Sequence, residues 1–432
     1  MPEDSPARSG PAGRFHYAWV AAGVTFLVLL STAAVRSSPS IMMVPWEEEF
    51  HWSRATVSLA ASINILLFGL MGPFAAGFIK AFGARRVILC SLTVTGLGAL
   101  ASLWMESPYA LVATWGIVVG AGTGMATVVL GASVVNTWFH SKRGVVLGAL
   151  TGANATGQLL FLPAMAYIVS HQGWRYTVSA VLLYLILLVP LVRFLMRNRP
   201  EDVGLRPYGW PKERPPASPP ASRVQANPFA ETVQGLRIGL RSREFWLLAG
   251  SFFICGASTN GLVGTHLVPA CMDHGIPEVK AAGLLAIMGI FDLLGTTGSG
   301  WLSDRFDNRK LLFMYYALRG LALIYLPHGF RHSETGLSIF AVFYGLDWIA
   351  TVPPTLGLAA QAFGRDRAAI MFGWIMVAHQ IGASLAAYLA GFFRTREGNY
   401  DHAFLAAGLL CVLTAFAVLR IGRRPEPALA IR

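Results

Sequence analysis

The chain has 432 residues, of which 54% are hydrophobic and only 13% are charged, and its formal net charge is +12. Soluble globular proteins carry about 25% charged residues, so this composition excludes soluble domains as well as disordered, coiled-coil, collagen-like and disulfide-rich secreted chains. A positive charge suggests a nucleic-acid partner in a soluble protein. In a membrane protein it follows from Lys and Arg in cytoplasmic loops, and no nucleic-acid partner is needed.

Apolar stretches long enough to cross a bilayer, which requires about 20 residues, recur along the chain. The first six are expected at residues 17–44, 54–79, 87–105, 109–136, 144–169 and 174–196. Residues 198–228 are polar and proline-rich, which predicts a linker, and residues 229–243 are expected to form a short basic interfacial helix. Six more spans are expected at residues 245–270, 280–302, 310–327, 335–361, 368–392 and 401–421. The sequence therefore predicts an all-α membrane protein with twelve transmembrane helices in two six-helix halves.

The domain organisation and orientation follow from these spans. The expected parts are an N-terminal tail, a first half, a cytoplasmic linker, a second half and a C-terminal tail, at residues 1–16, 17–197, 198–243, 244–422 and 423–432. With the N-terminus inside, 26 of the 34 basic residues fall on the cytoplasmic side, six on the opposite side and two within spans. Both termini are therefore expected in the cytoplasm, and the membrane is expected to be a bacterial inner (plasma) membrane.

Short motifs recur between the two halves at a nearly constant offset. Residues 76–86 (AGFIKAFGARR) follow the second span, and residues 300–310 (GWLSDRFDNRK) follow the eighth span 224 residues later. Gly173 and Gly398, which open the sixth and twelfth spans, are 225 residues apart. A twofold repeat of six helices is typical of transporters whose binding site lies between the halves near the membrane midplane.

The loop after the eighth span resembles the signature of the major facilitator superfamily. Its residues are Gly300-x-x-x-Asp304-Arg305-x-x-x-Arg309-Lys310, with Asp307 where a glycine is usual. In that superfamily the acidic residue helps to latch the cytoplasmic face. The resemblance therefore implies a structural or gating role for Asp304, Arg305 and Arg309. Lys80 stands at the acidic position of the first-half copy, so a symmetric latch is not implied.

Three further motifs resemble the monocarboxylate transporter branch of that superfamily, which includes the oxalate–formate exchangers. They are WFxxKRG at residues 138–144, GWR at residues 173–175 and RPEDxGL at residues 199–205. The resemblance implies the major facilitator fold and a carrier of small organic anions of the monocarboxylate class.

Arg36 is the first of four charged residues expected inside the spans. Charged side chains within a bilayer are costly and mark functional sites by default. Arg36 lies about 19 residues into the first span, which places it toward the outer half of the membrane. A guanidinium can grip a carboxylate through two parallel hydrogen bonds. We therefore expect Arg36 to bind the substrate anion, with a structural tie as the alternative.

The other three charged residues are Asp292, Arg319 and Asp347. Asp292 lies near the middle of the eighth span, and Phe291-Asp292 resembles the Phe-Asp of the branch, where the acid takes part in proton coupling and an arginine usually follows one turn on; this sequence has Thr296 there. We expect Asp292 to exchange a proton, with helix packing or an interhelical hydrogen bond as the alternative. Arg319 and Asp347 both fall near the midplane, so we expect them to pair. The pair is either structural or leaves Asp347 facing the cavity as a second proton-coupling group.

Uncharged polar residues within the spans complete the predicted substrate site: Asn64, Asn154, Gln158, Asn260, His379 and Gln380. Amides also hold membrane helices together, and a lone histidine is more often a hydrogen-bonding group than a ligand, which also applies to His266. The four cysteines have no paired spacing, and no zinc-protease, hydrolase or Walker A pattern occurs. We therefore expect no enzyme activity, no metal and no cofactor.

The sequence as a whole predicts a monomeric secondary active transporter of a small organic anion that works by alternating access with proton symport. In this reading Arg36 holds the carboxylate, and Asp292 exchanges the proton together with His379. The alternative is an anion exchanger or an exporter of another small solute, such as a drug or a sugar. A remote alternative is a transport-derived membrane sensor.

Overall fold

The structure is a computed structural model that describes residues 16–211, 228–332 and 334–422. The expected tails and part of the expected linker lie outside these ranges. The first half contains α1 (Tyr17–Ser37), α2 (Pro39–Phe50), α3 (Arg54–Phe82), α4 (Ala84–Ser102), α5 (Pro108–Leu111), the π-helix η1 (Val112–Val119), α6 (Gly120–Gly124), α7 (Val128–Trp138), α8 (Arg143–Gln172) and α9 (Trp174–Leu195), and the 3₁₀ turn η2 (Pro200–Val203) follows in the expected linker.

The second half contains a comparable set of helices. They are α11 (Arg243–Gly256), the π-helix η3 (Ala257–Val263), α12 (Gly264–Asp273), α13 (Glu278–Ser303), α14 (Asn308–His332), α15 (Glu334–Asp347), α16 (Val352–Phe363), α17 (Arg365–Glu397) and α18 (Asp401–Val418). Before them, α10 (Pro228–Leu240) lies within the expected linker, where a short helix is predicted. Eleven helical stretches of the described residues are long and apolar enough to cross a membrane. The 30-residue α8 occupies the position of the remaining expected span.

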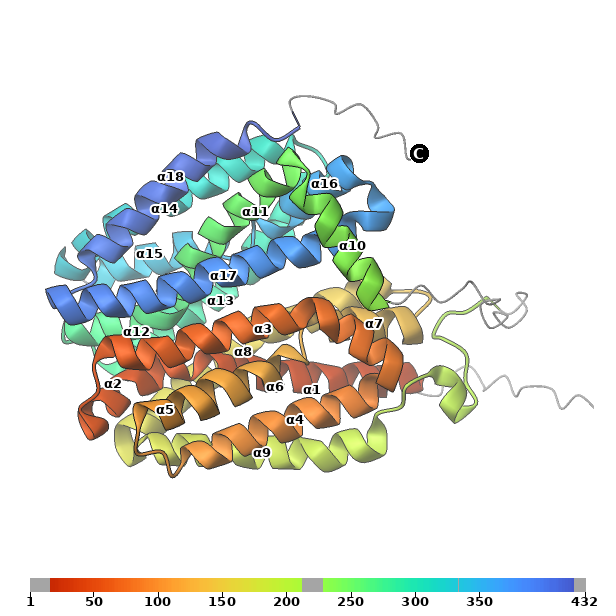
Figure 1. Cartoon of the computed structure of the whole chain (residues 1–432), viewed down its shortest axis with the longest axis horizontal. Helices are drawn as coiled ribbons and strands as arrows, with labels where there is room; N and C mark the ends of the chain where they lie inside the picture. Colours follow the sequence, from red (N-terminus) through yellow and green to blue (C-terminus); the bar gives the residue numbers. More distant parts are fainter. Residues whose placement is uncertain (1–15, 212–227, 333, 423–432) are drawn as a thin grey trace, which may run out of the picture.

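The two halves lie side by side, and their boundary runs along the helices (Figure 1). α3 packs against α17, and α8 packs against α13. α1 begins and α18 ends at the same end of the bundle, which is also where the chain leaves α9 (Figure 1). We call this end the linker end. The opposite end, which contains the turns at residues 51–53 and 274–277, is called the far end.

The first membrane helix is longer than hydropathy predicts. Hydropathy detects only the apolar part, up to about Val44, but α2 continues through the three glutamates to Phe50. It ends at His51, whose left-handed backbone (φ 54°) cannot continue the helix. Arg36 consequently lies near the middle of a 34-residue helical stretch and not clearly toward its outer end.

Two helices that look continuous in the sequence are broken at equivalent places. The fourth span is interrupted between α6 and α7, and the tenth span between α15 and α16. The restarting residues, Val128 and Val352, are 224 residues apart, the same offset as the loop motifs. Pro353 and Pro354 open α16, where prolines are tolerated because the first helical N–H groups have no helical partner. The repeat therefore extends from sequence motifs to helix breaks.

Candidate functional site

Arg36 is a cation with an aromatic neighbour and no described anionic partner. It lies in the last turn of α1, and its guanidinium carbon is 3.9 Å from the centroid of the Phe68 ring on α3. That distance allows a cation–π interaction. The side chain is half-buried, and no carboxylate of the described residues forms an ion pair with it. A guanidinium carries five N–H donors, so Arg36 has the donors to bind an anion.

The turn of α3 that carries Phe68 also touches the second half of the protein. Gly69 packs so closely against Gln380 of α17 that a Cβ at this glycine would overlap the glutamine side chain. Gln380 is buried, and its Oε1 has no hydrogen-bond partner among the described residues. Arg36 and Gln380 thus lie against one short stretch of α3, at the boundary between the halves.

His379 precedes Gln380 and is also incompletely bonded. Its ring lies 5.6 Å from the Phe252 ring, measured between centroids, and its Nδ1 has no hydrogen-bond partner among the described residues. Buried polar atoms are rarely left without partners. Adjacent residues of α17 therefore each leave a buried polar atom open: Gln380 faces α3 of the first half, and His379 lies against α11 of the second.

The predicted amides divide into three groups. Asn64 uses its Nδ2 to donate to the carbonyl of Trp115 at 2.7 Å, which ties α3 to η1. Asn260 lies half-buried in the π-helix η3, and π-helical turns occur frequently at functional sites. Asn154 and Gln158 lie on α8, but their side chains are outside the described part of the structure.

Asp292 binds a backbone N–H group at the break in the tenth span. The carboxylate is 5% exposed, and its Oδ1 accepts hydrogen bonds from the backbone N–H of Ile349 at 2.9 Å and from the Thr296 hydroxyl at 3.0 Å. Ile349 lies between α15 and α16, where helical hydrogen bonds are interrupted. Asp292 therefore has a structural contact in addition to any role in proton exchange, and Thr296 is its partner in place of the arginine usual in the branch.

Replacing Asp292 with Ala is expected to destabilise the protein by about 1–3 kcal/mol, because the partly buried N–H of Ile349 loses its acceptor. Asp292→Asn keeps an oxygen at the same position and is expected to cost less. Thermal unfolding of both purified variants in detergent checks this difference. Equal losses for the two variants would contradict the proposed contribution of the Ile349 hydrogen bond.

Arg319 and Asp347 form a buried ion pair, with 2.5 Å between Arg319 Nε and Asp347 Oδ2. Arg319 also donates to the backbone carbonyls of Asp347 at 2.6 Å and Trp348 at 3.2 Å, and to Cys255 Sγ at 2.9 Å. Its side chain is 1% exposed. Like Asp292, Arg319 therefore binds polar groups that the break between α15 and α16 leaves open. Asp347 Oδ1 has no hydrogen-bond partner among the described residues.

The loop signature contains an ion pair between Asp307 and Arg309. Arg309 is bound by Asp307, with 2.7 Å between Nη2 and Oδ2, and the Asp307 carboxylate also accepts from the Arg309 backbone N–H. This hydrogen bonding lowers the pKa of Asp307. Asp304 is exposed, and Arg305 stacks on Trp301 at 4.1 Å. Asp307, where a glycine is usual, caps α14 and orients the arginine.

Sequence reasoning missed a charged network that joins the two halves at the far end. Arg54 of α3, which is 6% exposed, donates to Glu47 at 2.6 Å and to the Tyr400 hydroxyl at 2.6 Å. Its Nη2 lies 3.8 Å from Asp273, which is held by Arg394 at 2.6 Å. We call these five residues the far-end network. One feature of the sequence could have indicated this network: Arg54 and Arg394 are two of only six basic residues expected at this end of the protein.

His266 is a structural part of the same region. Its Nδ1 lies 3.1 Å from the Tyr400 hydroxyl and its Nε2 lies 2.7 Å from the carbonyl of Ala387. Both ring nitrogens therefore have partners. This arrangement agrees with a hydrogen-bonding histidine that positions Tyr400 against Arg54.

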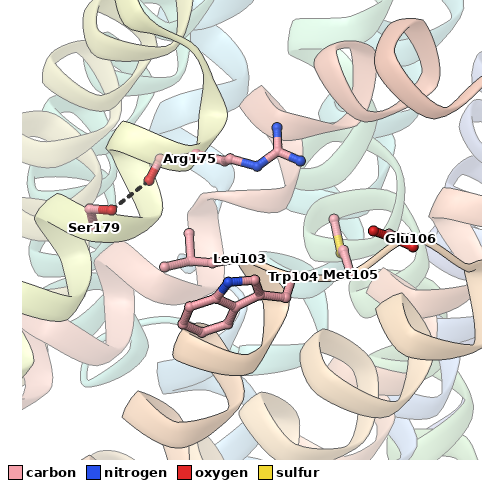
Figure 2. Close-up of a pocket in the computed structure, with 6 residues that line it drawn as sticks. All are labelled: Leu103, Trp104, Met105, Glu106, Arg175 and Ser179. Carbon is pink, nitrogen blue, oxygen red and sulfur yellow. Dashed lines mark hydrogen bonds between the residues drawn. The ribbon is translucent and has the colours of Figure 1, made fainter.

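A cavity of about 480 Å³ at the far end belongs to the first half alone. Figure 2 shows its lining, which comes from the connection between α4 and α5 and from the start of α9, including Glu106, Arg175 and Ser179. Ser179 donates to the Arg175 carbonyl at 2.8 Å. Because this cavity does not reach the boundary between the halves, it is not suited to alternating access.

Comparison with known proteins places these features in context. A family model described as Major Facilitator Superfamily matches residues 25–387 and 284–431. The chain is 26% identical over 404 residues to the uncharacterized MFS-type transporter YcxA of Bacillus subtilis (strain 168), covering 91% of this chain and 92% of that protein. It is 26% identical over 398 residues to monocarboxylate transporter 13 of Bos taurus, covering 91% of this chain and 86% of that protein.

A second mammalian relative and a solved structure extend the comparison. The chain is 25% identical over 432 residues to monocarboxylate transporter 11 of Mus musculus, covering 97% of this chain and 90% of that protein. The crystal structure of a D-xylose–proton symporter matches with a TM-score of 0.69 at 14% identity, covering 94% of this chain and 98% of that chain. At this identity the likeness is evidence for the fold alone, and it confirms the predicted twelve-helix arrangement.

Proposed function

This chain belongs to the major facilitator superfamily, and we propose that it is a secondary active transporter of a small organic anion of the monocarboxylate class. Membership of the superfamily confirms the resemblance carried by the loop signature. It also confirms that the chain is a multi-pass membrane transporter and not an enzyme. Two of its relatives are monocarboxylate transporters, which supports the substrate class.

The observation that carries the proposal is the guanidinium of Arg36, which has no described carboxylate partner. A cation in a spanning helix is costly, and Phe68 offsets only part of that cost by a cation–π contact. A substrate carboxylate would supply the anionic partner of Arg36 through two parallel hydrogen bonds. Gln380 and His379 would bind the remaining polar atoms from the other half. A ligand held by both halves near their boundary suits alternating access.

Proton symport is the proposed driving force. Asp292, Asp347 and His379 are buried titratable groups of the second half, and a proton exchanged at one of them would neutralise the charge of the carried anion. We further propose that the linker end faces the cytoplasm, because most basic residues lie there. An inward proton gradient is then expected to drive uptake into vesicles that hold the protein in this orientation.

Arg36→Ala is the direct test of the substrate site. Charge-assisted hydrogen bonds contribute about 1.5–3 kcal/mol, so the variant is expected to bind small monocarboxylates about ten- to hundredfold more weakly. Arg36→Lys keeps the charge but lacks the planar guanidinium, so its carboxylate affinity is expected to lie between those of the wild type and Arg36→Ala. The measurement is a thermal-shift titration of purified protein with lactate, pyruvate and acetate, since a ligand stabilises the state that it binds.

Arg193→Ala is the matched control, because Arg193 is an exposed arginine at the linker end of α9. It is expected to leave the carboxylate titration unchanged. Wild-type-like carboxylate affinity in a folded Arg36→Ala variant would overturn the proposed site. A drug or sugar that stabilises the wild type while all carboxylates fail would favour the alternative, an exchanger or exporter of another solute.

A further inference from the structure

A second cavity lies at the far end, on the boundary between the two halves. Its volume is about 490 Å³, and it is lined by α2, α8 and α9 from the first half and by the facing ends of α12 and α13 from the second. Its charged lining consists of Glu48 and Glu49 on α2 and Glu278 on α13, while the lining from α8, α9 and α12 is uncharged. The cavity is therefore an acidic space that exists only where the halves meet.

Glu278 is the buried carboxylate of this cavity. It is 8% exposed, and its Oε1 is fully buried without a hydrogen-bond partner among the described residues. An ionised carboxylate buried without a partner is strongly unfavourable, and such a group normally becomes neutral. The exposed Glu48 on the facing helix increases the cost, because like charges at short range repel.

Three neighbouring carboxylates differ from Glu278 in having arginine partners. Glu47 is bound by Arg54 and Asp273 by Arg394. Glu49 is bound by Arg175 at 2.5 Å, and it also accepts from the indole N–H of Trp174 at 2.6 Å.

Glu278 has no arginine among the described ion pairs at this end. Within the part of the chain that the structure describes, Glu278 is thus a boundary carboxylate that is buried without an arginine partner.

We propose that Glu278 is a proton-binding site of the far-end boundary, neutral when the halves close and ionised when they separate. On closure, its carboxylate takes a proton from the water at the far end; on opening, the proton returns to that water. Acid at the far end therefore favours the closed arrangement. This site acts on the closure of the far end and is independent of the solute carried, so it stands apart from the proposed role of Arg36.

The test measures the separation of the halves directly. Spin labels are attached at Tyr109→Cys in the first half and His402→Cys in the second, both exposed at the far end. The background carries Cys90→Ser, because Cys90 is exposed whereas the other three cysteines are buried. Full-length protein in lipid nanodiscs is examined by double electron–electron resonance over a series of pH values.

In the wild-type background, the short-distance population is expected to fall as the pH rises through one midpoint. Glu278→Gln, which imitates the neutral acid, is expected to keep the short distance at every pH. Glu48→Gln removes the repelling charge and is expected to move the midpoint to lower pH. Glu106→Gln is the matched control, because Glu106 is exposed at the same end but lines the cavity of the first half, and its midpoint should equal that of the wild type.

Two results would overturn the proposal. One is a distance distribution in the wild-type background that does not change with pH. The other is an unchanged midpoint in Glu278→Gln, which would assign the pH dependence to another group of this boundary, such as His266. Carboxylate binding by Arg36, measured separately by thermal shift, tests the transported solute, so failure of one proposal is distinguishable from failure of the other.

Discussion

Replacing Arg54 with Ala is expected to open the far end of the protein. Arg54 is buried, and it joins Glu47 in the first half to Tyr400 and Asp273 in the second. Truncating one partner of a buried, hydrogen-bonded charge pair at an interface costs about 2–5 kcal/mol. A shift of this size changes a closed-to-open ratio by a factor of about 30 or more. The fraction of protein in the closed arrangement is therefore expected to fall.

A cysteine placed behind the network reports this opening. Ser62 and Ser384 lie buried at the boundary, with 2.8 Å between their hydroxyl oxygens. Ser62→Cys in a Cys90→Ser background should react slowly with a membrane-impermeant thiol reagent, and adding Arg54→Ala should accelerate labelling at least tenfold. Thermal unfolding checks that the variant remains folded.

His402→Ala is the matched control for this experiment. His402 also binds a glutamate at the far end, Glu397, but both residues belong to the second half and neither lines the boundary cavity. Its removal eliminates a contact within one half, so labelling at position 62 should change little. An equal acceleration in both variants would mean that the network contributes no specific connection between the halves.

The sequence predicts the parts of the fold that depend on local hydropathy and on the repeat. Spans, halves and loop motifs each follow from residues near one another or at the 224-residue offset. Arg319 and Asp347 could be paired because the spans fix their depths, and they lie only 28 positions apart. The far-end network could not be predicted in this way, because Arg54 and Tyr400 are 346 positions apart and no local pattern specifies that contact.

Hydropathy also fails to detect a helix break inside an apolar span. Residues 335–361 are mostly apolar despite Asp347, so hydropathy predicts one helix there. The structure interrupts that helix, and Asp292 and Arg319 bind the exposed backbone groups. An acid at mid-span suggests proton coupling when only its depth is known. Its hydrogen bond to a backbone N–H becomes visible only with the three-dimensional structure.

Replacing Arg319 with Met is expected to destabilise the protein by about 3–5 kcal/mol, the usual cost of breaking a buried ion pair by removing one partner. The Asp347 carboxylate would then remain buried without its cation, and the carbonyls of residues 347 and 348 would lose their donor. Chemical unfolding of purified protein in detergent measures the loss. Arg305→Met is the control, because Arg305 is exposed on Trp301 and surface substitutions usually change stability by less than about 0.5 kcal/mol.

The double variant Arg319→Met with Asp347→Leu separates the two parts of this cost. Removing both charges eliminates the unpaired carboxylate, and apolar replacements of buried ion pairs are often neutral. Recovery should nevertheless be incomplete here, because the two carbonyls at the helix break still lack a donor, at about 1–3 kcal/mol for each unsatisfied group. Full recovery would mean that Arg319 serves only to neutralise Asp347. No recovery would mean that its main role is to hold the broken helix through the backbone.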